Sequence, residues 1–147
     1  MKPFPHSYTV TASKHLAGDV AIDAQKLPRL ITAPPAEFGG PGDRWSPETL
    51  LVAAVADCFI LTFRAIAAVS KLPWVSLRCE VTGALDRVDH VTQVTGFVMR
   101  VRLELSPETN KDQALKMLAK AEQTCLVTNS LKGKCQLEAA VDIAAAA

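Results

Sequence analysis

The stretch SPETLLVAAVADCFILTFRAIAAVS, residues 46–70, predicts a long helix around which the rest of the chain is organised. Ser46 is a favourable N-cap, Pro47 suits the first helical position, and Glu48 favours the positive end of the helix dipole. The residues that follow are good helix formers, and Pro73 bounds the far end. Because this helix is apolar nearly all round, we expect most of its faces to be buried.

The same helix has almost the length of a membrane span. Asp57 and Arg64 interrupt its apolar run, and each charge would cost roughly 2.5–3.5 kcal/mol at mid-membrane. A buried core helix is therefore the better interpretation. The first residues, MKPFPHSYTV, lack the apolar run of a signal peptide, so we expect a cytoplasmic protein.

Composition places the chain among ordinary globular proteins. It has 147 residues, of which 49% are hydrophobic and 21% charged, and we expect one domain over residues 1–147. The formal net charge is +1 and there is no block of like charges. These values argue against nucleic acid or an anionic membrane as the main partner.

Outside the central helix, the hydrophobic pattern alternates between strand and helix periods. The loop APPAEFGGPGDRWSPE, residues 33–48, precedes the helix. Residues 74–82 and 97–105 alternate with period two and predict two antiparallel, half-buried strands. The remaining expected elements are strands over 7–12, 18–23, 29–32 and 135–143, an amphipathic helix over 106–124 capped by Ser106, and a turn over 125–130. This order of elements predicts an α+β fold.

Four cysteines have neither CxxC form nor zinc spacing, so we expect no structural metal and no disulfide scaffold. Cys79 and Cys135 lie on the apolar faces of strands and are interpreted as core residues. Cys58 lies in the central helix beside Asp57. Cys125 lies where one helix ends and another turn begins, near unpaired backbone N–H groups that would stabilise a thiolate. The residues alone leave Cys58 open between an inert and a reactive thiol.

Two motifs resemble the osmotically inducible protein C and organic hydroperoxide resistance (OsmC/Ohr) superfamily. The first is FGGPGDRWSPETLLVAAVADCFILTF, residues 38–63, with a Gly-Gly loop, Ser-Pro-Glu, and Cys58 ten residues after Glu48. The second is AEQTCLVTNSLKG, residues 121–133, with Cys125 after the next long helix. The order of the elements matches as well, so the resemblance covers essentially the whole chain.

The resemblance implies a fold and a chemistry. The fold is α+β, with antiparallel sheets wrapped around long buried central helices in an intertwined homodimer. The chemistry is thiol-dependent reduction of peroxides, in which Cys58 resembles the peroxidatic cysteine, Cys125 the resolving cysteine, and Glu48 the carboxylate that orients an arginine. No bound cofactor is implied, because an external dithiol or lipoyl-type reductant restores both thiols. An apolar pocket around Cys58 would favour organic hydroperoxides over hydrogen peroxide.

The chain departs from the hydroperoxide-resistance pattern at the arginine. The loop after the first strand reads SKHLAGDV and contains Lys14 but no arginine, which suggests the OsmC-like branch. Arg44 is the first candidate to supply the cation, and Arg29 is another. Lys14 is a poorer choice, because an ammonium cannot form the bidentate pair that a guanidinium forms with a carboxylate.

The spacing of Glu48 and Cys58 carries a further expectation. Ten residues of helix separate them by about 15 Å, so they cannot share a site within one straight helix. If both are catalytic, either the helix is broken or Glu48 comes from a second subunit, which predicts a dimer with two composite sites; otherwise Glu48 only favours the start of the helix. Asp57 points about 100° away from Cys58 around the helix, and we expect it to be structural.

Two other functions remain compatible with these residues. One is a non-catalytic dimer of the same fold that binds a small lipophilic ligand in the apolar pocket. The other is a thiol redox sensor. The presence of both Cys58 and Cys125 favours the peroxidase, and the missing loop arginine favours the ligand-binding dimer.

Overall fold

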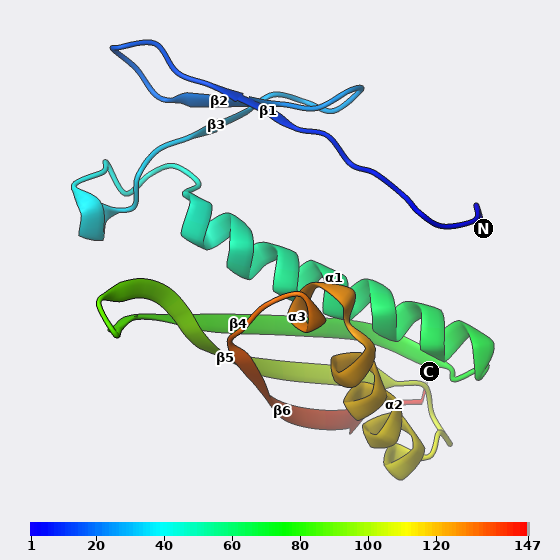
Figure 1. Cartoon of the computed structure of the whole chain (residues 1–147). Coiled ribbons are helices and arrows are strands. Elements are labelled where there is room, and N and C mark those ends of the chain that lie inside the picture. The colour runs from blue at the N-terminus through cyan, green and yellow to red at the C-terminus, as the bar shows by residue number, and fades with distance from the viewer. Residues whose placement is uncertain (147) are drawn as a thin grey trace. The chain divides into compact units, whose positions relative to one another are not determined.

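The computed structural model describes residues 1–146 and forms two compact units, residues 1–51 and the chain from Val52 onward (Figure 1). The first unit contains a three-stranded antiparallel sheet in the order β1-β2-β3. The strands are β1 (Thr11–Ser13), β2 (Val20–Asp23) and β3 (Leu30–Thr32). The three predicted strands are present and each is shorter than predicted, but β1 overlaps its predicted range, 7–12, only at Thr11 and Ala12.

The loop before the central helix requires both of its paired glycines. A short 3₁₀ helix, η1 (Ala36–Phe38), ends at Gly39, which has a φ of 78° that favours glycine. A side chain at Gly40 would collide with the carbonyl of Pro34. The Gly-Gly motif is thus needed for the close backbone turn that precedes the helix.

The central helix, α1 (Pro47–Val69), begins where the sequence predicts. The amide of Thr49 donates to Ser46 Oγ at 3.2 Å, and the amide of Ser46 donates to Thr49 Oγ1 at 2.8 Å. This reciprocal pair satisfies two backbone donors at the helix start. The helix is continuous through Cys58, so the alternative of a broken helix is wrong.

The expectation that α1 is buried on most faces is wrong for the single chain. Its buried residues recur every fourth position and form one stripe: Val55, Phe59, Phe63 and Ala67. On other faces Leu61 remains 49% exposed and Val69 86% exposed. Phe63 of this stripe packs against Trp74 with ring centroids 5.7 Å apart, so the stripe faces the sheet of the second unit. By length and composition α1 is also the one helix within residues 1–146 that could cross a membrane.

The second unit is built on a sheet in the order β4-β5-β6. β4 (Trp74–Val88) and β5 (Val91–Leu105) form a long antiparallel hairpin, which extends well beyond the two predicted segments. β6 (Lys134–Ile143) joins β5 in parallel, so the sheet is mixed rather than antiparallel throughout. The parallel pairing arises because two helices lie between β5 and β6 and return the chain to the same end.

Those helices are α2 (Lys111–Thr124) and α3 (Leu126–Asn129). The N-cap of α2 is Asn110, whose Oδ1 accepts from the Gln113 amide at 3.0 Å, and not Ser106 as predicted. Glu108, with a φ of 63°, interrupts the expected first turn.

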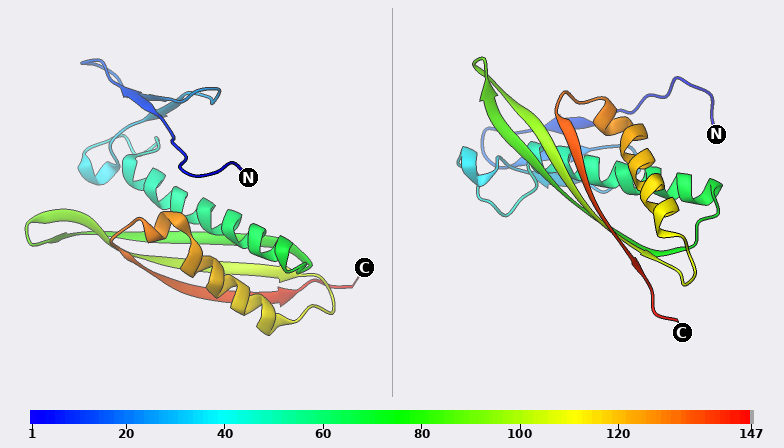
Figure 2. Two further views of the ribbon diagram at one scale, coloured as in Figure 1. Left: turned by 45° about the vertical axis from the view of Figure 1, so that its right-hand side comes forward. Right: turned by 90° about the horizontal axis from the view of Figure 1, so that it is seen from below.

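The core of this unit lies between the sheet and its helices. α2 packs along β6, and the part of α1 within this unit lies over β4 on the same face of the sheet (Figure 2). Gly83 of β4 allows this approach, because a Cβ there would lie only 2.9 Å from Val52 Cγ2. The inward side chains of β5 are all buried: Phe97, Met99, Val101, Leu103 and Leu105.

Candidate functional site

Cys58 and Cys125 meet in the second unit, although they lie far apart in the sequence. Cys58 is half-buried in the middle of α1. Cys125 is fully buried at the junction where α2 ends and α3 begins. Cys125 acts on the pKa of Cys58, so the two thiols are neighbours in the structure. The structure therefore brings together the two cysteines that the family resemblance singles out.

The α2–α3 junction is held by its own hydrogen bonds. The amide of Cys125 donates to the Glu122 carbonyl at 3.3 Å, and the amide of Asn129 donates to the Cys125 carbonyl at 3.1 Å. Thr128 Oγ1 also donates to that carbonyl at 3.1 Å. These contacts fix the Cys125 backbone beside α1, which restricts where its thiol can lie.

Two donors from the same chain reach the Cys58 sulfur. Thr62 lies one turn further along α1, with Oγ1 3.9 Å from Cys58 Sγ. The backbone amide of Val127, in α3, lies near enough to the sulfur to lower the pKa of Cys58. Sequence reasoning missed both residues. The spacing of four between Cys58 and Thr62 was a local signal for the first, but no local signal exists for Val127.

Burial and hydrogen bonding act in opposite directions on Cys58. Desolvation is the largest influence and raises the pKa of the thiol above its ordinary value, and the neighbouring Cys125 adds to the increase. The Val127 amide and the Thr62 hydroxyl lower the pKa of Cys58, because they stabilise the thiolate. Within this chain the pKa remains raised, so a nucleophilic Cys58 needs further stabilisation from outside it.

The remaining cysteines lie on the sheet, as predicted. Cys79 in β4 and Cys135 in β6 are both half-buried. Desolvation raises the pKa of Cys79 to about 12, with Cys135 as a smaller cause. Desolvation also raises the pKa of Cys135 to about 11, and Glu122 contributes. Thiols with such pKa values are almost entirely protonated at neutral pH and are poor nucleophiles.

Glu48 lies in the first turn of α1. One carboxylate oxygen, Oε2, is buried and has no hydrogen-bond partner among residues 1–146. Burying a carboxylate oxygen without a hydrogen-bond donor raises the free energy of the folded state, so we expect a donor to bind this atom in the functional protein.

The candidate cations for this carboxylate are engaged elsewhere. Arg44 pairs with Asp19 at 3.4 Å and with Asp43 at 3.0 Å. Arg29 forms a two-pronged pair with Asp23, at 2.8 and 3.0 Å. Both arginines are exposed, and Lys14 donates to the backbone carbonyls of His15 and Leu16.

Asp57 and Arg64 are both exposed on α1. No ion pair joins them within residues 1–146, and Asp57 is absent from the contacts of the Cys58 sulfur. The structure offers no further account of Asp57. Among the same residues, no group of three or more His, Cys, Asp and Glu side chains is arranged to hold a metal ion.

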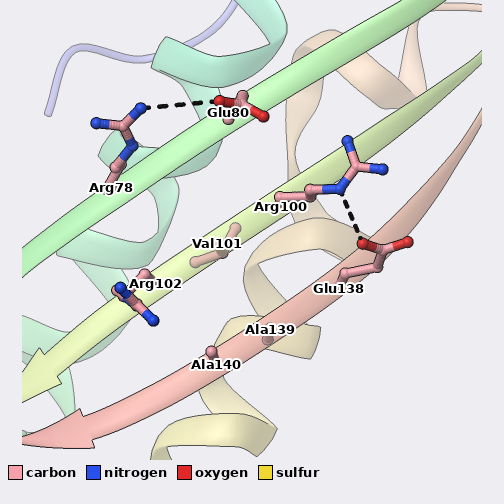
Figure 3. Close-up of a pocket in the computed structure, with 8 residues that line it drawn as sticks. All are labelled: Arg78, Glu80, Arg100, Val101, Arg102, Glu138, Ala139 and Ala140. Carbon is pink, nitrogen blue, oxygen red and sulfur yellow. Dashed lines mark ion pairs between the residues drawn. The ribbon is translucent and has the colours of Figure 1, made fainter.

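A hollow of about 400 Å³ lies on the outer face of the sheet, away from the cysteines (Figure 3). Four of its charged residues pair with one another, Arg78 with Glu80 at 3.7 Å and Arg100 with Glu138 at 3.1 Å. Because side chains alternate along a strand, Arg78 points away from the core while Cys79 points into it. This hollow is therefore separate from the thiol pair. Its full lining is Arg78, Glu80, Arg100, Val101, Arg102, Glu138, Ala139 and Ala140.

The fold and the neighbouring thiols of Cys58 and Cys125 indicate a class of protein, and the comparison with known families indicates the same class. The model of the OsmC-like protein family matches residues 40–140, and this chain belongs to that family. The matched range includes Glu48, Cys58 and Cys125.

Two curated relatives are similar along most of this chain. An organic hydroperoxide resistance protein of Xanthomonas axonopodis pv. citri (strain 306) is 35% identical over 121 residues, covering 80% of this chain and 78% of that protein. The uncharacterised protein YmaD of Bacillus subtilis (strain 168) is 30% identical over 114 residues, covering 74% of this chain and 76% of that protein.

Solved structures share the fold. An OsmC-like protein from Vibrio cholerae O1 biovar eltor superposes with a TM-score of 0.85 at 18% identity, covering 92% of this chain and all of that one. An organic hydroperoxide resistance protein OsmC from Legionella pneumophila superposes with a TM-score of 0.69 at 24% identity, covering 95% and 99%. The predicted α+β, OsmC-like fold with sheets and a central helix is thereby confirmed.

Proposed function

We propose that this protein is a thiol-dependent peroxidase that reduces organic hydroperoxides. The observation that carries the proposal is that Cys58 and Cys125, two free thiols from distant parts of the chain, lie near enough for Cys125 to act on the pKa of Cys58. The name of the Xanthomonas relative, an organic hydroperoxide resistance protein, supports the same substrate class. The apolar residues that surround Cys58 along α1 suit an alkyl hydroperoxide better than hydrogen peroxide.

The reaction has three steps. The Cys58 thiolate attacks the distal peroxide oxygen, an S–O bond forms as the O–O bond breaks, and the alkoxide leaves and takes up a proton to become the alcohol. Cys125 then attacks the sulfur of the resulting sulfenic acid, and water leaves as the disulfide forms. A dithiol, such as a lipoyl group, finally reduces that disulfide and is itself oxidised.

A homodimer is part of this proposal. The apolar faces of α1 that the single chain leaves exposed, around Leu61 and Val69, would be covered by a second copy. Since α1 is unbroken, Glu48 lies about 15 Å along the helix axis from the Cys58 of its own chain. Two antiparallel copies of α1 would instead bring Glu48 of one subunit toward Cys58 of the other.

Glu48 would then orient an arginine beside the reacting sulfur. Its unpartnered, buried Oε2 supports this role, since a guanidinium would satisfy that atom and stabilise the Cys58 thiolate at the same time. Arg44 is the candidate we favour, as it lies four residues before Glu48. Its present partners, Asp19 and Asp43, are exposed, so exchanging them costs little.

Steady-state turnover tests the proposal. Purified protein is mixed with cumene hydroperoxide and dihydrolipoamide, beside Cys58→Ser and a matched Cys79→Ser variant. We expect turnover that Cys58→Ser reduces to the rate of free dithiol and that Cys79→Ser leaves unchanged. Light scattering on the same sample should give the mass of a dimer, and a monomer with full activity would contradict the composite site.

Absence of turnover by a folded dimer would contradict the peroxidase and favour the ligand-binding function. Oxidation of Cys58 by peroxide without catalytic consumption would favour the redox sensor instead. Because sensors and binders do not consume peroxide in many cycles, turnover separates the three functions.

A further inference from the structure

We propose that Thr62 is a catalytic residue of this site, with a hydroxyl that donates a hydrogen bond to the Cys58 thiolate during attack on the peroxide. This inference rests on the proposed function, because it assumes that Cys58 is the nucleophile. It adds a group that belongs to the same helix as the nucleophile and needs no second subunit.

The hydroxyl of Thr62 has few other uses. Within residues 1–146 the Cys58 sulfur, at 3.9 Å, is its one hydrogen-bond partner. Hydroxyl side chains in helices commonly bond to the carbonyl four residues earlier. Thr124 does so with Lys120 at 2.8 Å, and Ser130 does so with Leu126 at 2.8 Å. Thr62 contacts the side chain four residues earlier instead, which directs its hydroxyl to the reacting atom.

This contact separates Cys58 from the other half-buried cysteines. Desolvation raises the pKa of Cys58, Cys79 and Cys135 alike. Within the described residues 1–146, Val127 and Thr62 lower the pKa of Cys58, and no donor lowers the pKa of Cys79 or Cys135. Of these two donors, only the Thr62 hydroxyl can be removed by a substitution, because Val127 contributes its backbone amide.

None of the titratable side chains around Cys58 among the described residues stabilises its thiolate, which leaves that role to the Thr62 hydroxyl and the Val127 amide. Cys125, from the α2–α3 junction, is the titratable neighbour that acts on Cys58, and its charge opposes a second thiolate. On α1 itself, Asp57 and Arg64 are exposed and do not contact the sulfur. Among residues 1–146, therefore, neutral donors rather than a cation stabilise the Cys58 thiolate.

Alkylation of Cys58 by iodoacetamide across pH tests the proposal without depending on peroxide chemistry. The variants are Thr62→Val, which keeps the shape and removes the hydroxyl, and Thr62→Ser, which keeps the hydroxyl. Each variant is made in the full-length protein, and its unfolding is measured to show that the fold is retained. Thr62→Ala replaces Thr62→Val if the valine variant does not fold. Peptide mass spectrometry reads Cys58 and, as an internal control, Cys79 in the same sample.

Loss of a hydrogen-bond donor to the thiolate should change the pH profile of Cys58 alkylation in a way that a general loss of structure would not. The pKa of Cys58 should rise in Thr62→Val, so alkylation below that pKa slows, by about threefold to tenfold. The high-pH plateau should rise, because a thiolate of higher pKa is intrinsically more nucleophilic. The two pH profiles should cross, Thr62→Ser should follow wild type, and Cys79 labelling should not change.

Superimposable profiles for wild type and Thr62→Val would overturn the proposal, as would Thr62→Ser behaving like Thr62→Val. The second-order rate with cumene hydroperoxide is measured on the same proteins. If wild type fails to react with peroxide while the alkylation profiles still cross, the peroxidase function is wrong and the hydrogen bond to the Cys58 thiolate stands.

Discussion

Cys58 and Cys79 are both half-buried thiols on elements that flank one core, yet their surroundings differ in kind. Cys79 sits on a strand among apolar side chains, and desolvation raises its pKa to about 12. Cys58 is also desolvated, but it has Thr62, the Val127 amide and a second thiol within reach. We therefore expect the donors and the partner thiol, rather than burial, to distinguish Cys58 as the proposed nucleophile from Cys79.

Among the substitutions that separate Cys58 from Cys79, removal of the partner thiol, Cys125, should change turnover the most. Cys125→Ser leaves Cys58 with its donors but without a resolving group, so we expect turnover with excess peroxide to fall, on the order of tenfold or more, because an intramolecular thiol acts at a high effective concentration. The sulfenic acid should persist and progress to sulfinic acid. Intact mass spectrometry measures this overoxidation, and a variant that cycles like wild type without it would show that Cys125 does not resolve.

Removing Cys79 should have the smallest effect. We expect Cys79→Ala to cost roughly 1 kcal/mol of unfolding free energy, because it deletes one half-buried side chain that has no hydrogen bonds. Turnover should be unchanged. Urea denaturation and the steady-state assay measure the two quantities, and a loss of turnover in a stable Cys79→Ala protein would erase the contrast between Cys58 and Cys79.

Local signals made much of the fold predictable from the sequence. Ser46, Pro47 and Glu48 mark the start of α1 through chemistry that acts within one turn, and the structure begins the helix there. Tertiary contacts explain the departures. The parallel pairing of β6 with β5 depends on a crossover through two helices, and the single buried stripe of α1 depends on what covers it.

The candidate site was less predictable than the fold. Cys58 and Cys125 came from a family resemblance, because nothing local in the sequence shows that two distant cysteines meet. The Val127 amide could not be predicted at all, since its position depends on how α3 packs against α1. Thr62 could have been found from its spacing to Cys58. Whether Arg44 serves Glu48 stays a prediction, as does the composite dimer site.

Mapping of the disulfide after one equivalent of cumene hydroperoxide tests the central claim most directly. Reduced protein is oxidised, remaining thiols are blocked, and peptides are read by mass spectrometry. The expected result is that each chain loses two hydrogen atoms, that Cys58 and Cys125 are joined, and that Cys79 and Cys135 remain free thiols. Unoxidised Cys58, or a disulfide that joins any other pair, would contradict it.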